Sequence, residues 1–292
     1  MESIISAVHR KYNMTDSNVF DGDPRVSEWF LMDSLGSVLT MCLLYLLMVK
    51  HGPSFMERRQ PLSMTPLLVI YNFALVILSA YIFIEMLSVG IIRSYGFFCQ
   101  PVNYDDTAIG IREANAAWWY FFSKVIELLD TTFFILRKKN RQVTFLHVYH
   151  HSTMMVICWY VAKYVPGGEK FYNGGFNCLV HVFMYTYYGL AAMGPGIQKY
   201  LWWKRYLTEF QLIQFLFVNI RCIGSFFNGP CEYPRWINIV ALFYSSSLLL
   251  LFLNFYLKSY KAKPFALNGK DKVNGSANGG KNGLVEDIKK GN

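Results

Sequence analysis

Three histidines within five residues carry the clearest chemistry in this sequence. His147, His150 and His151 are half of the six histidines in the chain, and they lie inside a long apolar run. At the helical spacing i, i+3 and i+4 their rings share one face. Imidazole titrates near neutral pH, so such a row can carry protons, bind a metal ion or attack an electrophilic carbon. The non-functional alternative is that these rings are structural and satisfied between helices.

Three other apolar segments carry polar side chains at helical spacing. The first has Lys124, Glu127 and Asp130, the second Asn177, His181, Tyr185 and Tyr188, and the third Thr208, Gln211 and Gln214. Ionisable groups are costly in apolar segments, so they face a cavity or one another. The Lys124–Asp130 group is therefore either an internal ion pair that ties helices together or the polar wall of a site. Gln residues in a membrane span more often join helices than catalyse.

The elements that must position these residues are apolar helices. The chain has 292 residues, of which 53% are hydrophobic and only 16% charged. Runs near the length of a membrane span cover roughly 30–50, 66–90, 114–136, 143–164, 171–193, 206–227 and 235–257. The first run begins too late and is too long for a cleaved signal peptide. We expect one all-α membrane domain with these seven spans, in which the short Pro166–Gly168 loop makes the fourth and fifth spans antiparallel neighbours.

The net charge of +9 is unevenly distributed and predicts an orientation. Basic residues gather in alternate loops, namely Lys50, Arg58 and Arg59; Arg137, Lys138, Lys139 and Arg141; Lys199, Lys204 and Arg205; and Lys258, Lys261 and Lys263. By the positive-inside rule these loops are cytosolic, with a lumenal or extracellular N-terminus and a cytosolic C-terminus. The histidine row then lies near the cytosolic end of its span.

Weaker signals agree with that orientation. Asn13 begins an Asn-Met-Thr glycosylation sequence on the predicted lumenal side. Cys99 and Cys231 are the cysteines of the predicted loops, both lumenal, and we expect them to form a disulfide. The Gly-, Asn- and Lys-rich tail is expected to be disordered. Lys289 and Lys290 near its end match a dilysine retrieval signal for the endoplasmic reticulum.

Histidine count and spacing narrow the chemistry without deciding it. A di-iron oxygenase uses more histidines than the six present, and His9 and His51 lie outside the group. His147, His150, His151 and His181 could supply nitrogens to one zinc ion. However, adjacent residues on a helix point about 100° apart, which makes a shared ion awkward for His150 and His151. Metal-free acid–base or nucleophilic catalysis on an acyl group is the third interpretation.

The same four motifs resemble the signatures of the very long chain fatty acid elongase (ELOVL) family. They read Lys124-x-x-Glu127-x-x-Asp130-Thr131, His147-x-x-His150-His151, His181-x-x-Met184-Tyr185-x-Tyr187-Tyr188 and Thr208-x-x-Gln211-x-x-Gln214, and the resemblance covers about residues 25–260. Gln142 ahead of the histidine row is similar to the branch that acts on polyunsaturated and very long chains. Met155–Tyr160 departs from the paired-tryptophan pattern of the family, in a region expected to line the acyl tunnel.

The resemblance implies a 3-ketoacyl-CoA synthase of the endoplasmic reticulum membrane, which condenses a long-chain acyl-CoA with malonyl-CoA. It implies seven spans, six of them in a barrel around an acyl tunnel. The expected organisation is a lumenal segment at 1–29, the elongase domain at 30–260 and a cytosolic tail at 261–292. The expected partners are the two CoA substrates, the bilayer, and the reductases and dehydratase of the elongation cycle. No cofactor, metal or nucleic acid is expected, and homo-oligomerisation is left open.

Residue roles follow from the resemblance and from the residues present. His150 is expected to attack the thioester and form an acyl-imidazole, while His181 and Asn177 polarise the thioester or the enolate. His147 and His151 would handle protons or hold geometry. Substrate-binding roles fall to Lys124, Glu127, Asp130, Arg137, Lys138, Tyr185, Tyr188, Lys204, Arg205, Gln211 and Gln214. Cys158 is a weaker nucleophile candidate, because no base is evident beside it. A histidine-gated lipid transporter is the alternative function.

Overall fold

The computed structural model describes residues 22–227 and 233–261. The predictions of glycosylation at Asn13, of Cys231 as a disulfide partner and of a retrieval signal at Lys289 and Lys290 fall outside the described residues. Within the described residues the regular structure is helical, without a strand. The prediction of an all-α protein is therefore confirmed for the described residues.

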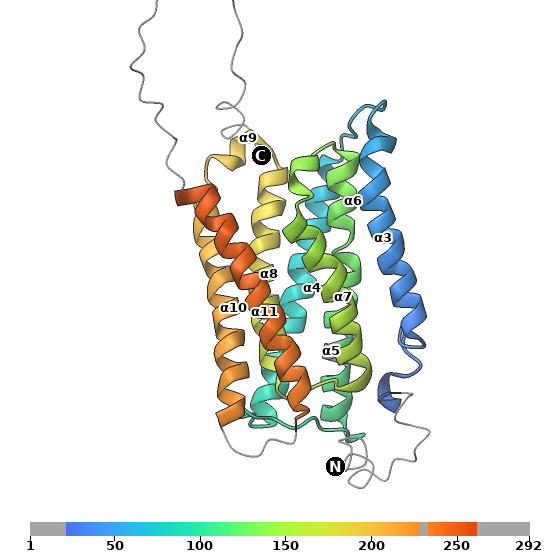
Figure 1. Cartoon of the computed structure of the whole chain (residues 1–292), viewed down its shortest axis with the longest axis vertical. Coiled ribbons are helices and arrows are strands. Elements are labelled where there is room, and N and C mark those ends of the chain that lie inside the picture. The colour runs from blue at the N-terminus through green and yellow to red at the C-terminus, as the bar shows by residue number, and fades with distance from the viewer. Residues whose placement is uncertain (1–21, 228–232, 262–292) are drawn as a thin grey trace, which may run out of the picture.

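Long helices run up and down alongside one another (Figure 1). Their bounds are α3 (Leu35–Met56), α4 (Thr65–Ile92), α5 (Ala108–Ile126), α6 (Leu129–Leu136), α7 (Phe145–Tyr164), α8 (Lys170–Ala192), α10 (Lys204–Phe227) and α11 (Arg235–Tyr256). Shorter elements are η1 (Pro24–Val26), η2 (Asn140–Gln142), α9 (Pro195–Gln198) and η3 (Leu257–Lys261). Every apolar run predicted from the sequence is helical over most of its length.

Four helices are long and apolar enough to cross a membrane by length and composition alone. These are α3, α4, α10 and the segment from Arg235 to Tyr260 that contains α11. The chain is thus a multi-pass membrane protein. The long helices outside this set are α5, α7 and α8. They carry Lys124 and the histidines at 147, 150, 151 and 181, and such polar side chains lower the mean hydropathy of a helix.

Local sequence signals set where the site-bearing helices begin and end. The Thr144 hydroxyl accepts a hydrogen bond from the backbone N–H of His147 at 3.2 Å, so the histidine row occupies the first turns of α7. Thr107 caps α5 in the same way, which starts that helix at Ala108, before the predicted residue 114. The predicted continuous run 114–136 is broken at Glu127–Leu128, between α5 and α6.

Packing between helices differs from the order in the sequence. α8 packs mainly against α4, and α7 packs against α5 and α3; α7 and α8 make no substantial contact with each other. The fourth and fifth spans run antiparallel, as predicted (Figure 1), but the prediction that they are neighbours was wrong, because they are not packed against each other. Gly189 of α8 allows the close approach to α4, because a Cβ there would lie 3.2 Å from the Phe73 ring. The two helices joined by Pro166–Gly168 are instead separated by a cavity.

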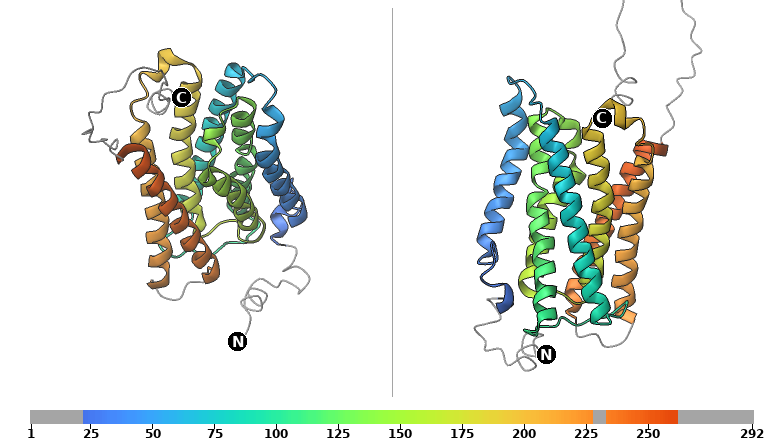
Figure 2. Two further views of the ribbon diagram at one scale, coloured as in Figure 1. Left: turned by 45° about the horizontal axis from the view of Figure 1, so that its top comes forward. Right: turned by 180° about the vertical axis from the view of Figure 1, so that it is seen from behind.

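The bundle has two distinct ends, both seen in Figure 2. The α3–α4 and α6–α7 connections and α9 lie at the upper end of Figure 1, together with the basic residues of those segments. The α4–α5 loop and the α7–α8 turn lie at the lower end. Cys99 in that lower loop is disulfide-bonded. Hydrogen bonding to the Arg93 guanidinium in the same loop holds the pKa of Asp105 well below its usual range.

Candidate active site

A cavity of about 220 Å³ lies between α7 and α8. Side chains of α4, α5, α7, α8, α10 and α11 line it. On α7 the lining runs from His150 to Val161, about 16 Å along the helix axis. Its wall is mostly apolar and aromatic, with residues such as Met154, Phe215 and Trp236. A long, mostly apolar space of this kind suits an alkyl chain.

Polar side chains from several helices face this cavity. His150 on α7, Asn177 on α8 and Gln214 on α10 are among them, and the lining also includes Cys158, Lys170, Asn173 and Ser245. Among the described residues His150 is the only histidine in the lining. A nitrogen nucleophile and two amides that can donate hydrogen bonds therefore face the same apolar space, which is the minimum set for chemistry on a carbonyl group.

The Asn177 amide is held by a residue that the sequence analysis missed. The Tyr120 hydroxyl donates to Asn177 Oδ1 at 3.0 Å, and Tyr120 also lines the cavity. Because the amide oxygen is engaged, the Asn177 NH₂ group is the part that remains to donate. Tyr120 lies one turn before Lys124 in an aromatic-rich helix, and no spacing rule distinguishes it there from packing aromatics.

The motif of Lys124 and Glu127 forms an internal ion cluster. Lys124 Nζ lies 2.7 Å from Glu127 Oε1, and His181 Nδ1 lies 3.1 Å from the same oxygen. All three side chains are buried, and none of them lines the cavity. The structure therefore favours the ion-pair interpretation of this motif, with His181 drawn in from α8. Asn177 lies one turn from His181 on α8, so the cluster adjoins the cavity wall.

Asp130 and Tyr185 form a second polar link to α8, this time from α6. The Tyr185 hydroxyl donates to Asp130 Oδ2 at 2.8 Å, so this carboxylate also ties α6 to α8. Tyr188 follows one turn later on α8 and is partly exposed. Gln211 donates from Nε2 to the Met184 sulfur at 3.6 Å and lies outside the cavity, unlike Gln214. Of the two predicted glutamines, the structure brings one to the cavity.

The three rings of the histidine row have different surroundings. His147 Nε2 lies 2.7 Å from the Thr131 hydroxyl, which in turn lies 3.1 Å from the Tyr45 hydroxyl of α3. The His147 and His151 rings are 4.2 Å apart between centroids, and the His150 and His151 rings are 5.3 Å apart. The shared helical face thus holds one ring on the cavity, one ring on a hydroxyl chain and one ring between them.

The predicted basic residues lie at the upper end of the bundle. Arg137 and Lys138 follow the end of α6, where Lys138 Nζ donates to the Glu57 carbonyl at 2.9 Å. Lys204 and Arg205 begin α10 and are exposed, with Arg205 Nε 2.9 Å from Glu209. The histidine row is in the first turns of α7 at this same end. No group of three or more His, Cys, Asp or Glu side chains in the described residues is arranged to hold a metal ion.

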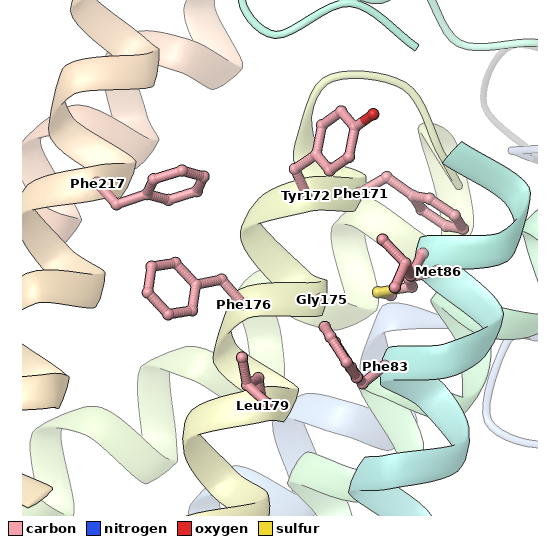
Figure 3. A pocket seen from close by; sticks show the side chains of 9 residues that line it. Phe83, Met86, Phe171, Tyr172, Gly175, Phe176, Leu179 and Phe217 are labelled. Carbon is pink, nitrogen blue, oxygen red and sulfur yellow. The ribbon is translucent and has the colours of Figure 1, made fainter. Parts of the chain in front are cut away.

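A second, smaller pocket of about 160 Å³ lies among α4, α8 and α10 (Figure 3). Phe176 and Phe217 point toward one another across it, with ring centroids 4.9 Å apart. Apart from the Tyr172 phenol its lining carries no titratable group. This pocket offers apolar surface without a reactive side chain, whereas the larger cavity has a histidine in its lining.

A family model and individual relatives among known proteins point to the same family. The family model described as ELO, GNS1/SUR4 family, matches residues 30–266. The chain is similar to very long chain fatty acid elongase 4 of Macaca mulatta, with 48% identity over 88% of this chain and 82% of that protein. It is 47% identical to human very long chain fatty acid elongase 4 over the same shares. Very long chain fatty acid elongase 5 of Tachysurus fulvidraco is 44% identical over 90% of this chain and 91% of that protein.

Proposed function

The chain belongs to the ELO (GNS1/SUR4) family of very long chain fatty acid elongases, which are 3-oxoacyl-CoA synthases, and we propose that its cavity carries out their condensation through His150. The reaction joins a long-chain acyl-CoA with malonyl-CoA and releases CO₂ and CoA. One observation carries the assignment of the nucleophile: His150 is the histidine that lines the apolar cavity, beside the amides of Asn177 and Gln214.

The first half-reaction is acyl transfer to the ring. A nitrogen of His150 attacks the thioester carbon, the carbon–sulfur bond breaks, and CoA leaves with the ring proton as a free thiol. The acyl chain stays in the cavity as an acyl-imidazole. The developing oxyanion accepts a hydrogen bond from the Asn177 NH₂ group, which Tyr120 orients through the amide oxygen. Gln214 of the neighbouring helix α10, which also lines the cavity, is the second donor in this scheme.

The second half-reaction forms the new carbon–carbon bond. Malonyl-CoA loses CO₂, and the carbon of the resulting enolate attacks the acyl carbonyl. The carbon–nitrogen bond to His150 then breaks, 3-oxoacyl-CoA is released, and the ring takes up one proton to return to neutral imidazole. His181, which Glu127 holds one turn from Asn177 behind the cavity wall, supports the Asn177 amide that polarises the thioester or the enolate oxygen. His147 and His151 keep the row in place and handle protons.

Substrate recognition divides between the cavity and the upper end of the bundle. The alkyl chain occupies the apolar cavity, and we assign it to the polyunsaturated and very long classes on the resemblance around Gln142. The CoA phosphates meet Arg137, Lys138, Lys204 and Arg205 at the upper end, because guanidinium and ammonium groups pair with phosphates. Lys124, Glu127, Asp130, Gln211, Tyr185 and Tyr188 support the reacting groups from behind the cavity wall.

Seven spans in the endoplasmic reticulum membrane complete the proposal. The order of contacts supports a barrel of six, since α7 packs on α5, α5 on α4, α4 on α8, α8 on α10, α10 on α11 and α11 on α7. α3 lies outside that ring, against α6 and α7. The basic upper end faces the cytosol by the positive-inside rule. The elongase domain spans 30–260, between a lumenal segment and a cytosolic tail, and works beside the reductases and dehydratase that consume its product.

Intact-mass measurement of purified protein incubated with acyl-CoA alone tests the intermediate. The wild type gains one acyl group, and His150→Ala gains none. His51→Ala is the matched control, because His51 is an exposed histidine of α3 and that variant keeps the adduct. An adduct that persists in His150→Ala, or none in the wild type, overturns the scheme. Release of labelled CO₂ from malonyl-CoA separates a condensing enzyme from a histidine-gated transporter, which releases none.

A further inference from the structure

We propose that Tyr45 of α3 and Thr131 of α6 form a directed hydrogen-bond chain that holds His147 as the Nδ1–H tautomer. Tyr45 and Thr131 are then positioning residues for the histidine row. The geometry of the chain stands by itself, while its role in catalysis rests on the proposed function. Through the Tyr45 hydroxyl, α3 then contributes to the site although it lies outside the ring of helices.

The hydrogen-bond chain links three polar groups one after another. The Tyr45 hydroxyl lies 3.1 Å from Thr131 Oγ1, and Thr131 Oγ1 lies 2.7 Å from His147 Nε2. Tyr45 is 4% exposed and Thr131 is fully buried. Neither hydroxyl has another hydrogen-bond partner among the described residues, so each must place its proton within the chain.

Counting protons fixes the direction. Tyr45 and Thr131 each have one hydroxyl proton, and the only group that can end the chain as a pure acceptor is an unprotonated ring nitrogen. If Tyr45 donates to Thr131 and Thr131 donates to His147 Nε2, both protons are used. If His147 donated from Nε2 instead, one of the two buried hydroxyl protons would have no acceptor, and such groups are rare in folded proteins. The neutral ring therefore carries its proton on Nδ1.

This direction separates the roles within the row. The lone pair of His147 Nε2 is engaged by Thr131, so His147 cannot use that nitrogen to accept an acyl group. Its ring is fixed 4.2 Å from the His151 ring, which packs in turn against His150. The chain from α3 thus sets the orientation of the row from its far side, while His150 keeps its place on the cavity.

Solution or solid-state ¹⁵N spectra of histidine-labelled protein in detergent or nanodiscs test the tautomer directly, because protonated and unprotonated ring nitrogens have well separated shifts. His147→Gln identifies the signals of this ring. The wild type is expected to show an unprotonated Nε2 for His147. A protonated Nε2 in the neutral ring overturns the proposal, whatever the activity of the protein.

Substitutions along the chain give a second, independent readout. Tyr45→Phe and Thr131→Val remove one link each and are expected to produce a mixture of tautomers, whereas Thr131→Ser keeps the hydroxyl and retains the wild-type spectrum. Tyr172→Phe is the matched control, since its hydroxyl also donates one 3.0 Å hydrogen bond, to the Tyr95 carbonyl at the lower end. An unchanged His147 spectrum in both Tyr45→Phe and Thr131→Val overturns the proposal.

Rates of labelled CO₂ release connect the chain to catalysis. Tyr45→Phe and Thr131→Val are expected to lower kcat by about tenfold with little change in KM, and Thr131→Ser to restore it; a tenfold loss corresponds to the net worth of about one hydrogen bond. An altered tautomer with unchanged kcat overturns the positioning role and leaves the proposed function standing. A wild type that releases no CO₂ refutes the proposed function and leaves the tautomer assignment to the spectra.

Discussion

At the scale of single residues, four histidines of one site differ by what each ring touches. His150 lines the cavity, His147 meets a hydroxyl, His181 meets a carboxylate and His151 packs between two rings. These contacts decide which nitrogen has a free lone pair and which ring is held in place. A helical spacing puts three rings on one face, but it does not state which ring a neighbouring helix engages.

The Lys124–Glu127 pair is expected to contribute to the stability of the fold. Glu127 Oε1 accepts from Lys124 and His181, while Oε2 has no partner in the described residues, so the carboxylate depends on these contacts. Lys124→Met leaves a buried charge without its cation and should lower the free energy of unfolding by about 3–5 kcal/mol. Thermal unfolding in detergent, with Tm as the readout, measures it.

Two comparisons make that measurement specific. Lys124→Met with Glu127→Gln should recover part of the loss, since the unpaired charge is gone. Arg205→Met breaks an exposed pair with Glu209 at 2.9 Å and should change Tm little. An unchanged Tm for Lys124→Met would mean that the cluster does not hold these helices together.

The sequence predicted which residues belong to the candidate site better than it predicted which of them contact one another. The four motifs predicted the elongase family, which the match over residues 30–266 confirms, and the spacing of three predicted the Lys124–Glu127 pair. His181 and Tyr45 join their partners from other helices, and spacing within one helix contains no information on such contacts. Tyr120 was missed because its segment is rich in aromatic residues.

At the scale of elements, the apolar runs predicted the helices because length and hydropathy are properties of each segment alone. Which helices pack together depends on the shape of their surfaces, and the sequence pattern did not predict the partners of α7 and α8. The short turn between α7 and α8 suggested direct packing, yet glycines let α8 approach α4 closely, and the cavity fills the space on its other side. The break between α5 and α6 falls at Glu127, inside an unbroken apolar run.

The α7–α8 turn offers an element-scale prediction. Gly168 has φ +63°, and a Cβ there would lie 2.9 Å from the Gln100 carbonyl oxygen, in the loop that joins α4 to α5. Its N–H also donates to Glu113 at 3.1 Å. Gly168→Ala should cost about 1–3 kcal/mol of stability through backbone strain. The Tm of this variant should fall clearly below that of the wild type.

Gly196→Ala is the matched control for the turn. Gly196 lies in α9, and a Cβ there would meet no atom within 4 Å. Its Tm should equal that of the wild type or rise slightly, because alanine restricts the unfolded chain. Equal effects of the two variants would show that the geometry of the α7–α8 turn does not hold the lower end of the bundle.

At the scale of the whole molecule, the site depends on six helices that leave a space between them. His150 faces that space from the first turns of α7 at the upper end, and the mostly apolar lining continues along α7 to Val161, with Lys170 and Asn173 of α8 near the lower end. At the lower end, Arg221 of α10 donates to the Phe97 and Glu169 carbonyls at 2.8 and 3.1 Å, and so joins the α4–α5 loop to the α7–α8 turn. The proposed nucleophile therefore lies toward one end of the apolar space, and loops joined by Arg221 lie at the other end. This arrangement suits an acyl chain whose thioester end binds at the nucleophile.

Ala241 tests whether the acyl chain follows this space. It lines the cavity on α11, one turn below Tyr244, whose hydroxyl accepts from Thr153 at 3.0 Å near the histidine row. Ala241→Phe fills the cavity beyond the reacting groups without touching them. The variant should still condense short acyl-CoAs while losing activity on long ones, so that gas chromatography of the products shows a shorter upper limit of chain length.

The outcome depends on where the added ring lies relative to the chain. Leu250→Phe places the same ring on the same helix at a position that is 67% exposed, and it should leave the product profile unchanged. A wild-type Tm for Ala241→Phe shows that the fold tolerates the ring. If that folded variant elongates long chains as the wild type does, the chain does not run along α11. If it loses short and long substrates alike, the cavity at Ala241 belongs to the reacting centre and does not hold the tail.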